Sequence, residues 1–337
     1  MAITLNGSTG ITTPTYGGSV PAEYITPVTG FKNIIINGNM QIAQRGTTAT
    51  GITTSGYNTV DRMLEVVFNA GTWDITQDTD VPTGQGFSNS LKMQCTSSLS
   101  LPADALLCID TRIEGQNLQQ LNYGTPNATP ITLSFWVKSN KIGTQTFVLQ
   151  NVESVGKAIS KTYTVDSANT WEKKTITIEG DASAAIVNTN GLGFVVRWVF
   201  AAGTNFSSGT LNTSWATLVV ANMVSPSNID LADTVGNYIN ITGVQLEKGD
   251  TATSFDYRPY GTELALCQRY YQVISVRVPT TAEGAALSGY ILPVTPRATP
   301  TVSGGGAGFS ASISPTGTYL QSQTAADFNN LEFSSEL

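Results

Sequence analysis

Alternating apolar and polar positions predict strands along most of the chain. In the clearest run, residues 131–138, Ile, Leu, Phe and Val alternate with Thr, Ser, Trp and Lys. A period of two places one face of a strand in a core and leaves the other outside. Residues 175–178 repeat this period, and residues 194–200 are apolar almost throughout, as in a strand buried on both faces. Strand signals recur between residues 32 and 258 at the spacing of a β-sandwich.

Residues 237–246 contain a change of phase. Ile239 and Ile241 mark one face, whereas Val244 and Leu246 fall on the opposite phase. The change occurs at Gly243, and a glycine inside a strand often marks a bulge. We therefore expect a β-bulge or a sharp bend at that residue.

One segment has the period of a helix. In residues 262–271, Leu264, Cys267 and Tyr271 fall at i, i+3 and i+7 and form one apolar stripe. A helix of about ten residues is too short to be stable alone, so the stripe has to pack on something. The strand-like residues 272–337 are few for a core of their own, since a domain of roughly 60 residues buries only about 60% of its surface. Three copies around one axis would share a core, and we predict a homotrimer with Leu264, Cys267 and Tyr271 at its interface.

The first 30 residues lack a sustained period. Glu23 is their one charged side chain, and Pro14, Pro21 and Pro27 exclude a helix. They are either a floppy leader or an arm that adds strands to a partner, and apolar anchors such as Ile11 favour the arm. The chain is thus expected to divide into a docking arm (1–30), a jelly-roll sandwich (31–260), a short trimerising helix (261–272) and a small C-terminal β domain (273–337).

Composition supports an all-β fold and narrows the partners. The chain has 47 Thr, more than its 17 basic and 24 acidic residues together. Thr favours pleated strands because its branched Cβ restricts χ1, so a helical bundle is excluded as the main architecture. A net charge of −7 gives no electrostatic footprint for nucleic acid. The longest apolar stretch, residues 191–203, is interrupted by Arg197 and is too short to cross a bilayer, so no membrane insertion is expected.

Two residue types limit the chemistry. Histidine is absent, which removes Ser-His-Asp triads, Cys-His dyads and imidazole metal sites. Cys95, Cys108 and Cys267 have no metal-type spacing and are expected to be reduced, packed thiols. We therefore predict no enzyme, no metal and no cofactor, and a hydrolase would have to work with carboxylates alone.

Two groups of acidic residues are candidates for carboxylate chemistry. The three aspartates of residues 74–80 could supply an acid–base pair or calcium ligands, but their setting fits the exit from a strand into a loop better. Asp110, Arg112 and Glu114 alternate with apolar residues, so we expect an exposed ion ladder on one strand face.

Aromatic side chains are the candidates for glycan contacts, because the flat face of a ring packs against the apolar face of a sugar. Trp136 lies on the polar face of its predicted strand, whereas Trp198 lies in an apolar run and is expected in the core. Tyr290, Phe309 and Tyr319 are further candidates in the C-terminal tail. For each candidate, packing within the protein is the alternative.

Several strings resemble a family of bacteriophage virion appendage proteins. They are NIIINGNMQIAQRGTT at 33–48, DRM at 61–63, TLSFWVKSN at 132–140, NTWEKKTITIEGD at 169–181 and ITGVQLEKGDTATSFDYRPYGTELALCQRYYQ at 241–272. The leader ITLNGSTGIT is similar to leaders of phage tail fibre proteins. Together the strings cover most of residues 1–272.

The resemblance implies a jelly roll similar to carbohydrate-binding modules, presented by a trimeric tail fibre that attaches the virion to its host. Its implied partners are a host surface glycan and a tail or portal-proximal protein that contacts residues 1–30. It implies synthesis in the host cytoplasm, residence in the virion tail and no catalytic residues. A capsid-attached fibre or decoration protein is the first alternative. A glycan depolymerase is the second, and the missing histidine disfavours it.

Overall fold

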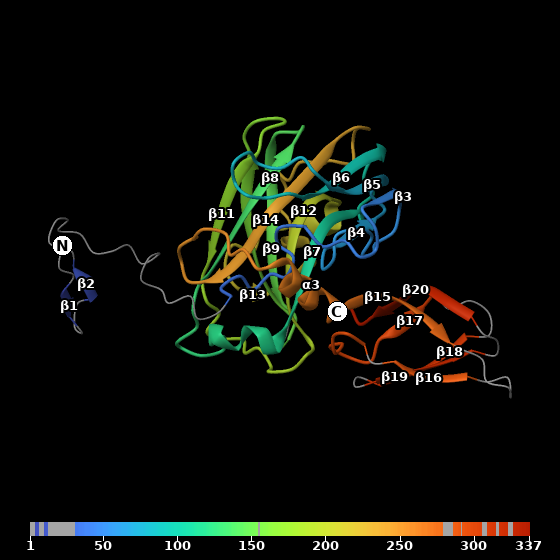
Figure 1. The fold of residues 1–337 in the computed structure, drawn as a ribbon. Coiled ribbons are helices and arrows are strands. Elements are labelled where there is room, and N and C mark those ends of the chain that lie inside the picture. The colour runs from blue at the N-terminus through green and yellow to red at the C-terminus, as the bar shows by residue number, and fades with distance from the viewer. Residues whose placement is uncertain are drawn as a thin grey trace.

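The computed structural model describes residues 4–6, 10–12, 31–153, 156–278, 286–290, 292–304, 309–314, 317–322 and 326–337, and the side chains of 31–153, 156–275, 292–304 and 331–337. Its main body is a pair of antiparallel sheets packed face to face, as the strand pattern predicts (Figure 1). The predicted docking arm lies outside the described residues, except for β1 (Thr4–Asn6) and β2 (Gly10–Thr12), which pair with each other.

Each sheet of the sandwich has six strands. The first sheet runs in the order β13 (Ala216–Thr217), β10 (Lys157–Val165), β9 (Gly143–Asn151), β12 (Leu192–Ala202), β7 (Leu106–Glu114) and β4 (Leu64–Phe68). The second runs in the order β11 (Glu172–Ile178), β8 (Ile131–Ser139), β14 (Tyr238–Lys248), β6 (Ser90–Ser97), β5 (Thr72–Asp78) and β3 (Thr48–Ile52). Most connections cross from one sheet to the other, so strands far apart in sequence become neighbours. This is the path of a jelly roll.

Large apolar side chains fill the space between the sheets. Phe135 of β8 meets Trp198 of β12 edge to face, with ring centroids 5.8 Å apart, and Phe147 of β9 lies 5.7 Å from Trp198. All three are fully buried, as their apolar strand positions predict. Each buried Phe side chain contributes roughly 1.5–3 kcal/mol by leaving water, so these contacts hold the two layers together.

The outer face of the first sheet is covered. Val148 of β9 and Val199 of β12 point into a second apolar cluster with Met223 and Val224. These two residues follow η2 (Val220–Asn222), and α2 (Thr204–Ser207) belongs to the same covering segment. β12 is therefore buried on both faces, which confirms the prediction for residues 194–200.

The predicted bulge at Gly243 is present in β14. The pairing of β14 with β8 shifts register between Thr242 and Gln245, and Gly243 has a φ of +62°, which favours glycine. The extra residue returns Val244 to the core that Ile241 occupies. Because the bulge adds one residue, the apolar positions shift by one in the sequence while the same face of the strand remains buried.

The segment that leads into the sandwich lies along β14. The Asn33 side chain accepts hydrogen bonds from the backbone of Ile35 (3.0 Å) and Leu246 (3.1 Å) and donates one to Val244 (3.0 Å). A Cβ at Gly38 would lie 2.0 Å from the Val244 carbonyl oxygen, so only glycine fits there. Asn33 and Gly38, both within residues 33–48, thus stabilise the sandwich of this chain by packing along β14.

The helix differs from its predicted bounds. α3 spans Tyr260–Gln268, and Tyr271 is already the first residue of a strand. Cys267 and Tyr271 are 0% and 3% exposed within the single chain, and only Leu264 of the predicted stripe is partly exposed. Cys267 and Tyr271 thus pack inside one chain and are not on its accessible surface, and the predicted trimer interface stays a prediction. Within the described part of the chain, no helix has the length and apolar character needed to span a bilayer.

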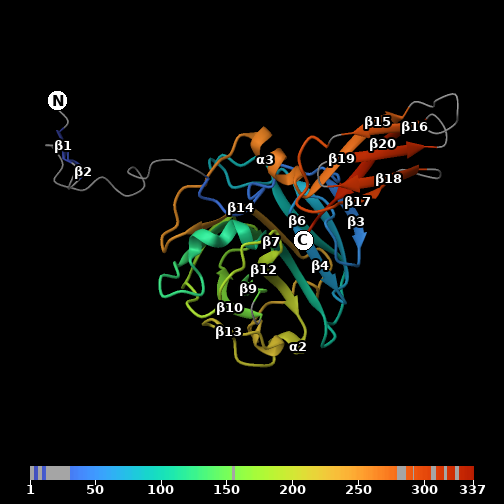
Figure 2. The ribbon, with the colours of Figure 1, turned by 90° about the horizontal axis from the view of Figure 1, so that it is seen from below.

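Beyond α3, two small sheets of three strands follow. One runs in the order β15 (Tyr271–Val278), β20 (Ala326–Ser334) and β17 (Thr301–Ser303), and the other in the order β16 (Ala286–Tyr290), β19 (Gly317–Ser322) and β18 (Phe309–Ser314). Figures 1 and 2 show these strands, orange to red, beside the sandwich.

Candidate functional site

The outer face of the second sheet carries aromatic side chains that are not fully buried. Trp136 of β8 stands there between Lys173 of β11 and Thr242 of β14, its partners in register, and is partly exposed. Phe87 lies beside it across Gly243. A Cβ at Gly243 would be 2.6 Å from Phe87 Cζ and 3.0 Å from Trp136 Cδ1, so the bulge glycine makes room for both rings.

Two further rings extend this surface from the loop after β14. Phe87 packs edge to face on Phe255 with centroids 5.1 Å apart, and it lies 5.7 Å from the Tyr257 ring. Tyr257 is 48% exposed, and its hydroxyl donates to the Gln85 carbonyl. We call Trp136, Phe87, Phe255 and Tyr257 the aromatic band.

Polar groups lie beside the band on the same face. Lys138 is two residues from Trp136 along β8, so both side chains point outward. Its ammonium group donates to Asp80 (2.7 Å), which also accepts a hydrogen bond from the Trp171 indole (2.9 Å). Partial burial acts to raise the pKa of Asp80, but the bonds from Lys138 and Trp171 outweigh it and hold that pKa below its ordinary value. Asp80 therefore stays ionised and acts as an acceptor.

The face continues toward β6 with a buried amide, Asn240, and the partly exposed ring of Tyr238. Asn240 of β14 is paired in register with Lys138 on one side and Lys92 on the other. Its Oδ1 is buried without a hydrogen-bond partner. Tyr238, two residues away, donates to Asn169 (2.7 Å), and the Lys92 ammonium lies 5.3 Å from its ring centroid. Aromatic faces beside amide, ammonium and carboxylate groups match a sugar, which has apolar C–H faces and a rim of hydroxyls.

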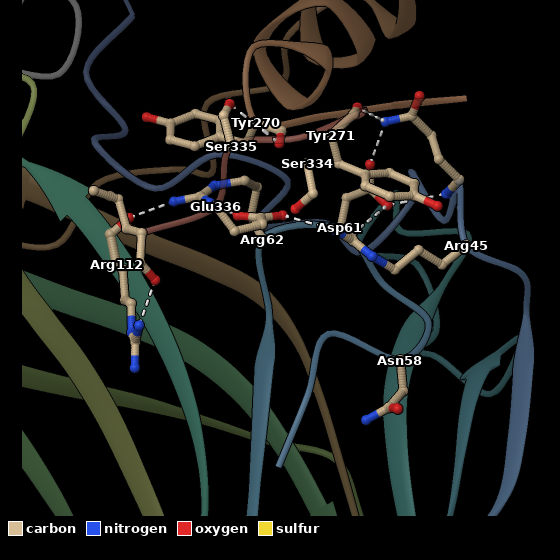
Figure 3. Close-up of polar contacts among 12 residues, drawn as sticks. Arg45, Asn58, Asp61, Arg62, Arg112, Tyr270, Tyr271, Ser334, Ser335 and Glu336 are labelled. Atoms are coloured by element: carbon tan, nitrogen blue, oxygen red, sulfur yellow. Dashed lines mark hydrogen bonds and ion pairs between the residues drawn. The ribbon is translucent and has the colours of Figure 1, made fainter. Parts of the chain in front are cut away.

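A buried ionic cluster joins the C-terminal strands to the sandwich (Figure 3). Glu336 accepts a hydrogen bond from Arg45 (3.2 Å) and pairs with Arg62 through its other oxygen. The guanidinium carbons of Arg62 and Arg45 lie 3.5 Å from the ring centroids of Tyr270 and Tyr271. Arg62 is 1% exposed, so it needs these partners to remain charged inside the protein. The cluster fixes the C-terminal strands and leaves no room for a ligand.

The expected exposed ladder of Asp110, Arg112 and Glu114 is wrong. Asp110 and Glu114 are fully buried. Arg197 of β12 binds Asp110 through two bonds of 2.7 Å, and Arg269 donates to Glu114 (2.8 Å). Burial acts to raise the pKa of Glu114, but the hydrogen bonds from Arg269 and Tyr270 outweigh burial, so this pKa is lowered. Alternation alone could not reveal this burial, because later segments of the chain cover the outer face of β7.

The other predicted residues fall in several places. In the part of the chain with described side chains, Trp198 is in the core, and Cys95, Cys108 and Cys267 are buried and form no disulfide, as predicted. Asp78 ends β5 and Asp80 follows in a loop, which confirms the strand-to-loop interpretation. Tyr290, Phe309 and Tyr319 belong to β16, β18 and β19, but their side chains lie outside the described residues. No three Cys, Asp or Glu side chains in the described part gather as metal ligands.

The sequence interpretation missed Phe87 and Tyr257 because both lie in loops without any period. Gly243 is the signal that could have found them. A glycine at a strand bulge often marks close approach by another segment, and here that segment is the Phe87 loop.

Comparison with known proteins gives likenesses of fold. No protein-family model and no curated protein sequence matches the chain. The enzymatically active domain of tailspike protein 4 from bacteriophage CBA120 is 16% identical over 64% of this chain and 21% of that one, with a TM-score of 0.34. A family 4 carbohydrate-binding module is 12% identical over 63% of this chain and 97% of that one, with a TM-score of 0.28. A putative sugar-binding protein from Bacteroides thetaiotaomicron is 12% identical over 64% of this chain and 99% of that one, with a TM-score of 0.32.

The sandwich is similar to carbohydrate-binding modules. The chain spans about a fifth of the tailspike domain it matches. A shared sandwich does not fix a ligand, which depends on the side chains that each chain places on it.

Proposed function

We propose that this protein is a non-catalytic phage appendage that binds saccharides of the host surface through its aromatic band. The observation that supports this most is the set of partly exposed rings around Trp136, beside Lys138 and Asp80, on the outer face of the second sheet. On the first sheet, the segment with α2 and η2 packs over outer-face apolar positions such as Val148 and Val199.

The virion role is supported by the resemblance of residues 33–48, 132–140 and 241–272 to phage appendage proteins. We propose a tail fibre in the virion tail, made in the host cytoplasm and docked through residues 1–30 onto a tail or portal-proximal protein. A capsid-attached fibre or decoration protein would use the same sandwich and differ only in where the arm docks. Localisation of the protein in a density map of whole particles would separate the two.

A glycan depolymerase is the alternative, and one carboxyl pair would carry it. Burial raises the pKa of Asp230, whereas the pKa of Asp233 is lowered because hydrogen bonds from Lys141 and Asn237 outweigh its partial burial. Carboxyl groups with pKa values moved apart suit acid–base catalysis. Both already have protein partners, however, including the bond from the Ala232 amide to Asp230 (2.7 Å). Release of oligosaccharides by the protein, with loss of release in Asp230→Asn, would favour the enzyme.

The binding proposal is tested by removing rings at the two ends of the band. Trp136→Ala and Tyr257→Ala should each weaken binding to host polysaccharide about tenfold or more, which corresponds to about 1.4 kcal/mol. Phe68→Ala is the matched control, because Phe68 is 52% exposed on β4 of the other sheet. Binding is measured by calorimetry after circular dichroism shows that each variant is folded. Unchanged affinity in both band variants would refute the proposal.

A further inference from the structure

A separate groove lies between the segment leading into the sandwich, η1 (Gly115–Leu121) and α3. Figure 2 looks onto the end of the sandwich at which α3 lies. The groove has a volume of about 400 Å³, within the roughly 300–1,000 Å³ typical of small-molecule sites. The residues that line it include none of the aromatic band.

The polar wall of the groove follows from the geometry of η1. A 3₁₀-helix has three residues per turn, so residues three apart lie on the same side. Leu118 and Leu121 are buried in the core on one side. Asn117 and Gln120 are exposed on another side and line the groove. Their carboxamides form no hydrogen bond with any other described residue, so they are available to a ligand as donors and acceptors.

The opposite wall is apolar and carries an exposed ring. Ile34 and Leu266 contribute aliphatic surface, and Phe31 is 56% exposed. A ligand that covers this ring would remove apolar surface from water, which is favourable. The flat face of Phe31 is the kind of surface on which the C–H groups of a sugar ring pack.

Arg258 closes the groove without giving it a net charge. Its guanidinium is 3.1 Å from the Glu263 carboxylate and 5.1 Å from the Phe31 ring centroid, and it also donates to the backbone of Ile35 (3.0 Å). The residue is 7% exposed, and its Nε has no hydrogen-bond partner. One buried donor is therefore left unsatisfied, while the charge is already neutralised by Glu263. The groove suits a neutral ligand rather than an anion.

We propose that this groove is a second saccharide site, for a neutral glycan and independent of the aromatic band. The ligand class rests on the proposed function, and the place and the residues rest on the groove itself. Asn117 and Gln120 would bind hydroxyl or acetamido groups, and Phe31 would pack against a ring face. Two sites on one chain would let one molecule bind two positions on a glycan surface, which raises the effective affinity.

The test counts sites on the full chain. The probes are tetrasaccharides of glucose and of N-acetylglucosamine, titrated by calorimetry to concentrations that detect a Kd of about 1 mM. The wild type should bind two molecules of at least one probe per chain. Asn117→Ala/Gln120→Ala and Phe31→Ala should each bind one, and Trp136→Ala should bind one at the groove. Asn127→Ala, which removes an exposed carboxamide outside the groove, should still bind two.

The outcomes separate the groove from the band. If the groove variants bind as the wild type does, the groove is not a saccharide site, even when Trp136→Ala shows that the band is. If only the groove variants lose binding, the groove is supported and the band is refuted. If the wild type binds neither tetrasaccharide, this inference is wrong. Asn117, Gln120 and Phe31 are all exposed, so the variants should remain folded, which circular dichroism checks.

Discussion

At the scale of single residues, Glu65 of β4 is a carboxyl group whose pKa burial raises well above its ordinary value. Its Oε2 accepts bonds from the backbone and side chain of Asn58 (3.0 and 3.1 Å), whereas its Oε1 is buried without a partner. Burial raises its pKa to about 8, although the bonds from Asn58 act to lower it. Glu65 is therefore mostly protonated in the folded protein at neutral pH, where an unfolded glutamate is ionised.

This difference predicts the direction of the pH dependence. The stabilisation is complete below the ordinary glutamate pKa, and it is lost as pH rises toward about 8, because the unfolded chain releases the proton first. The expected loss is on the order of a few kcal/mol in the free energy of unfolding. Glu65→Gln mimics the protonated form and should flatten the decline. Urea unfolding at several pH values checks this, and the exposed Glu179→Gln should leave the decline in place. An equal slope in Glu65→Gln and the wild type would contradict the assignment.

At the scale of elements, the alternation of apolar and polar residues predicted most strands of the sandwich. It did not predict the segment with α2 and η2 that covers the outer face of the first sheet. The half-buried β8, the doubly buried β12 and the bulge in β14 all follow from residues adjacent in sequence. The candidate site was predicted only at Trp136. Phe87 and Asp80 reach it from the loop between β5 and β6, and Tyr257 reaches it from the loop after β14. A local pattern of apolar and polar residues cannot predict that these two loops meet. The prediction that the charged residues of β7 are exposed failed for the same reason. Asp110 contacts Arg197 only because β7 and β12 are paired in the folded sheet.

Docking of the C-terminal strands on the sandwich depends on the residue pair Glu336 and Arg62. Glu336→Ala would leave the Arg62 guanidinium buried without its carboxylate, a change that costs roughly 3–5 kcal/mol in comparable pairs. Amides of β15 should then exchange with solvent faster, measured by hydrogen–deuterium exchange, while those of β12 in the sandwich core stay protected. Glu179→Ala removes an exposed carboxylate and serves as the control. Unchanged exchange in β15 would show that the ionic cluster does not hold these strands.

At the scale of the whole molecule, adhesion through shallow sites gains from repetition. A partly exposed band and an open groove each favour weak binding, and several copies on one particle multiply weak sites through effective concentration. The homotrimer predicted from the sequence would supply such repetition. With Cys267 and Tyr271 packed inside one chain, the partly exposed Leu264 of α3 is the residue of the original stripe that could still reach a threefold axis.

The trimer is tested by mass and by adhesion together. Light scattering of the full chain should give three chains per particle, and Leu264→Asp should give one, because it would bring three carboxylates together out of water. Leu99→Asp is the matched control, since Leu99 is an apolar side chain 40% exposed after β6, away from α3 in sequence. Binding to host cells should fall with Leu264→Asp by more than tenfold, while the affinity of each saccharide site for a tetrasaccharide stays the same. A wild-type mass of one chain would refute the trimer, and equal cell binding by trimer and monomer would refute the role of repetition, because each chain would then adhere by itself.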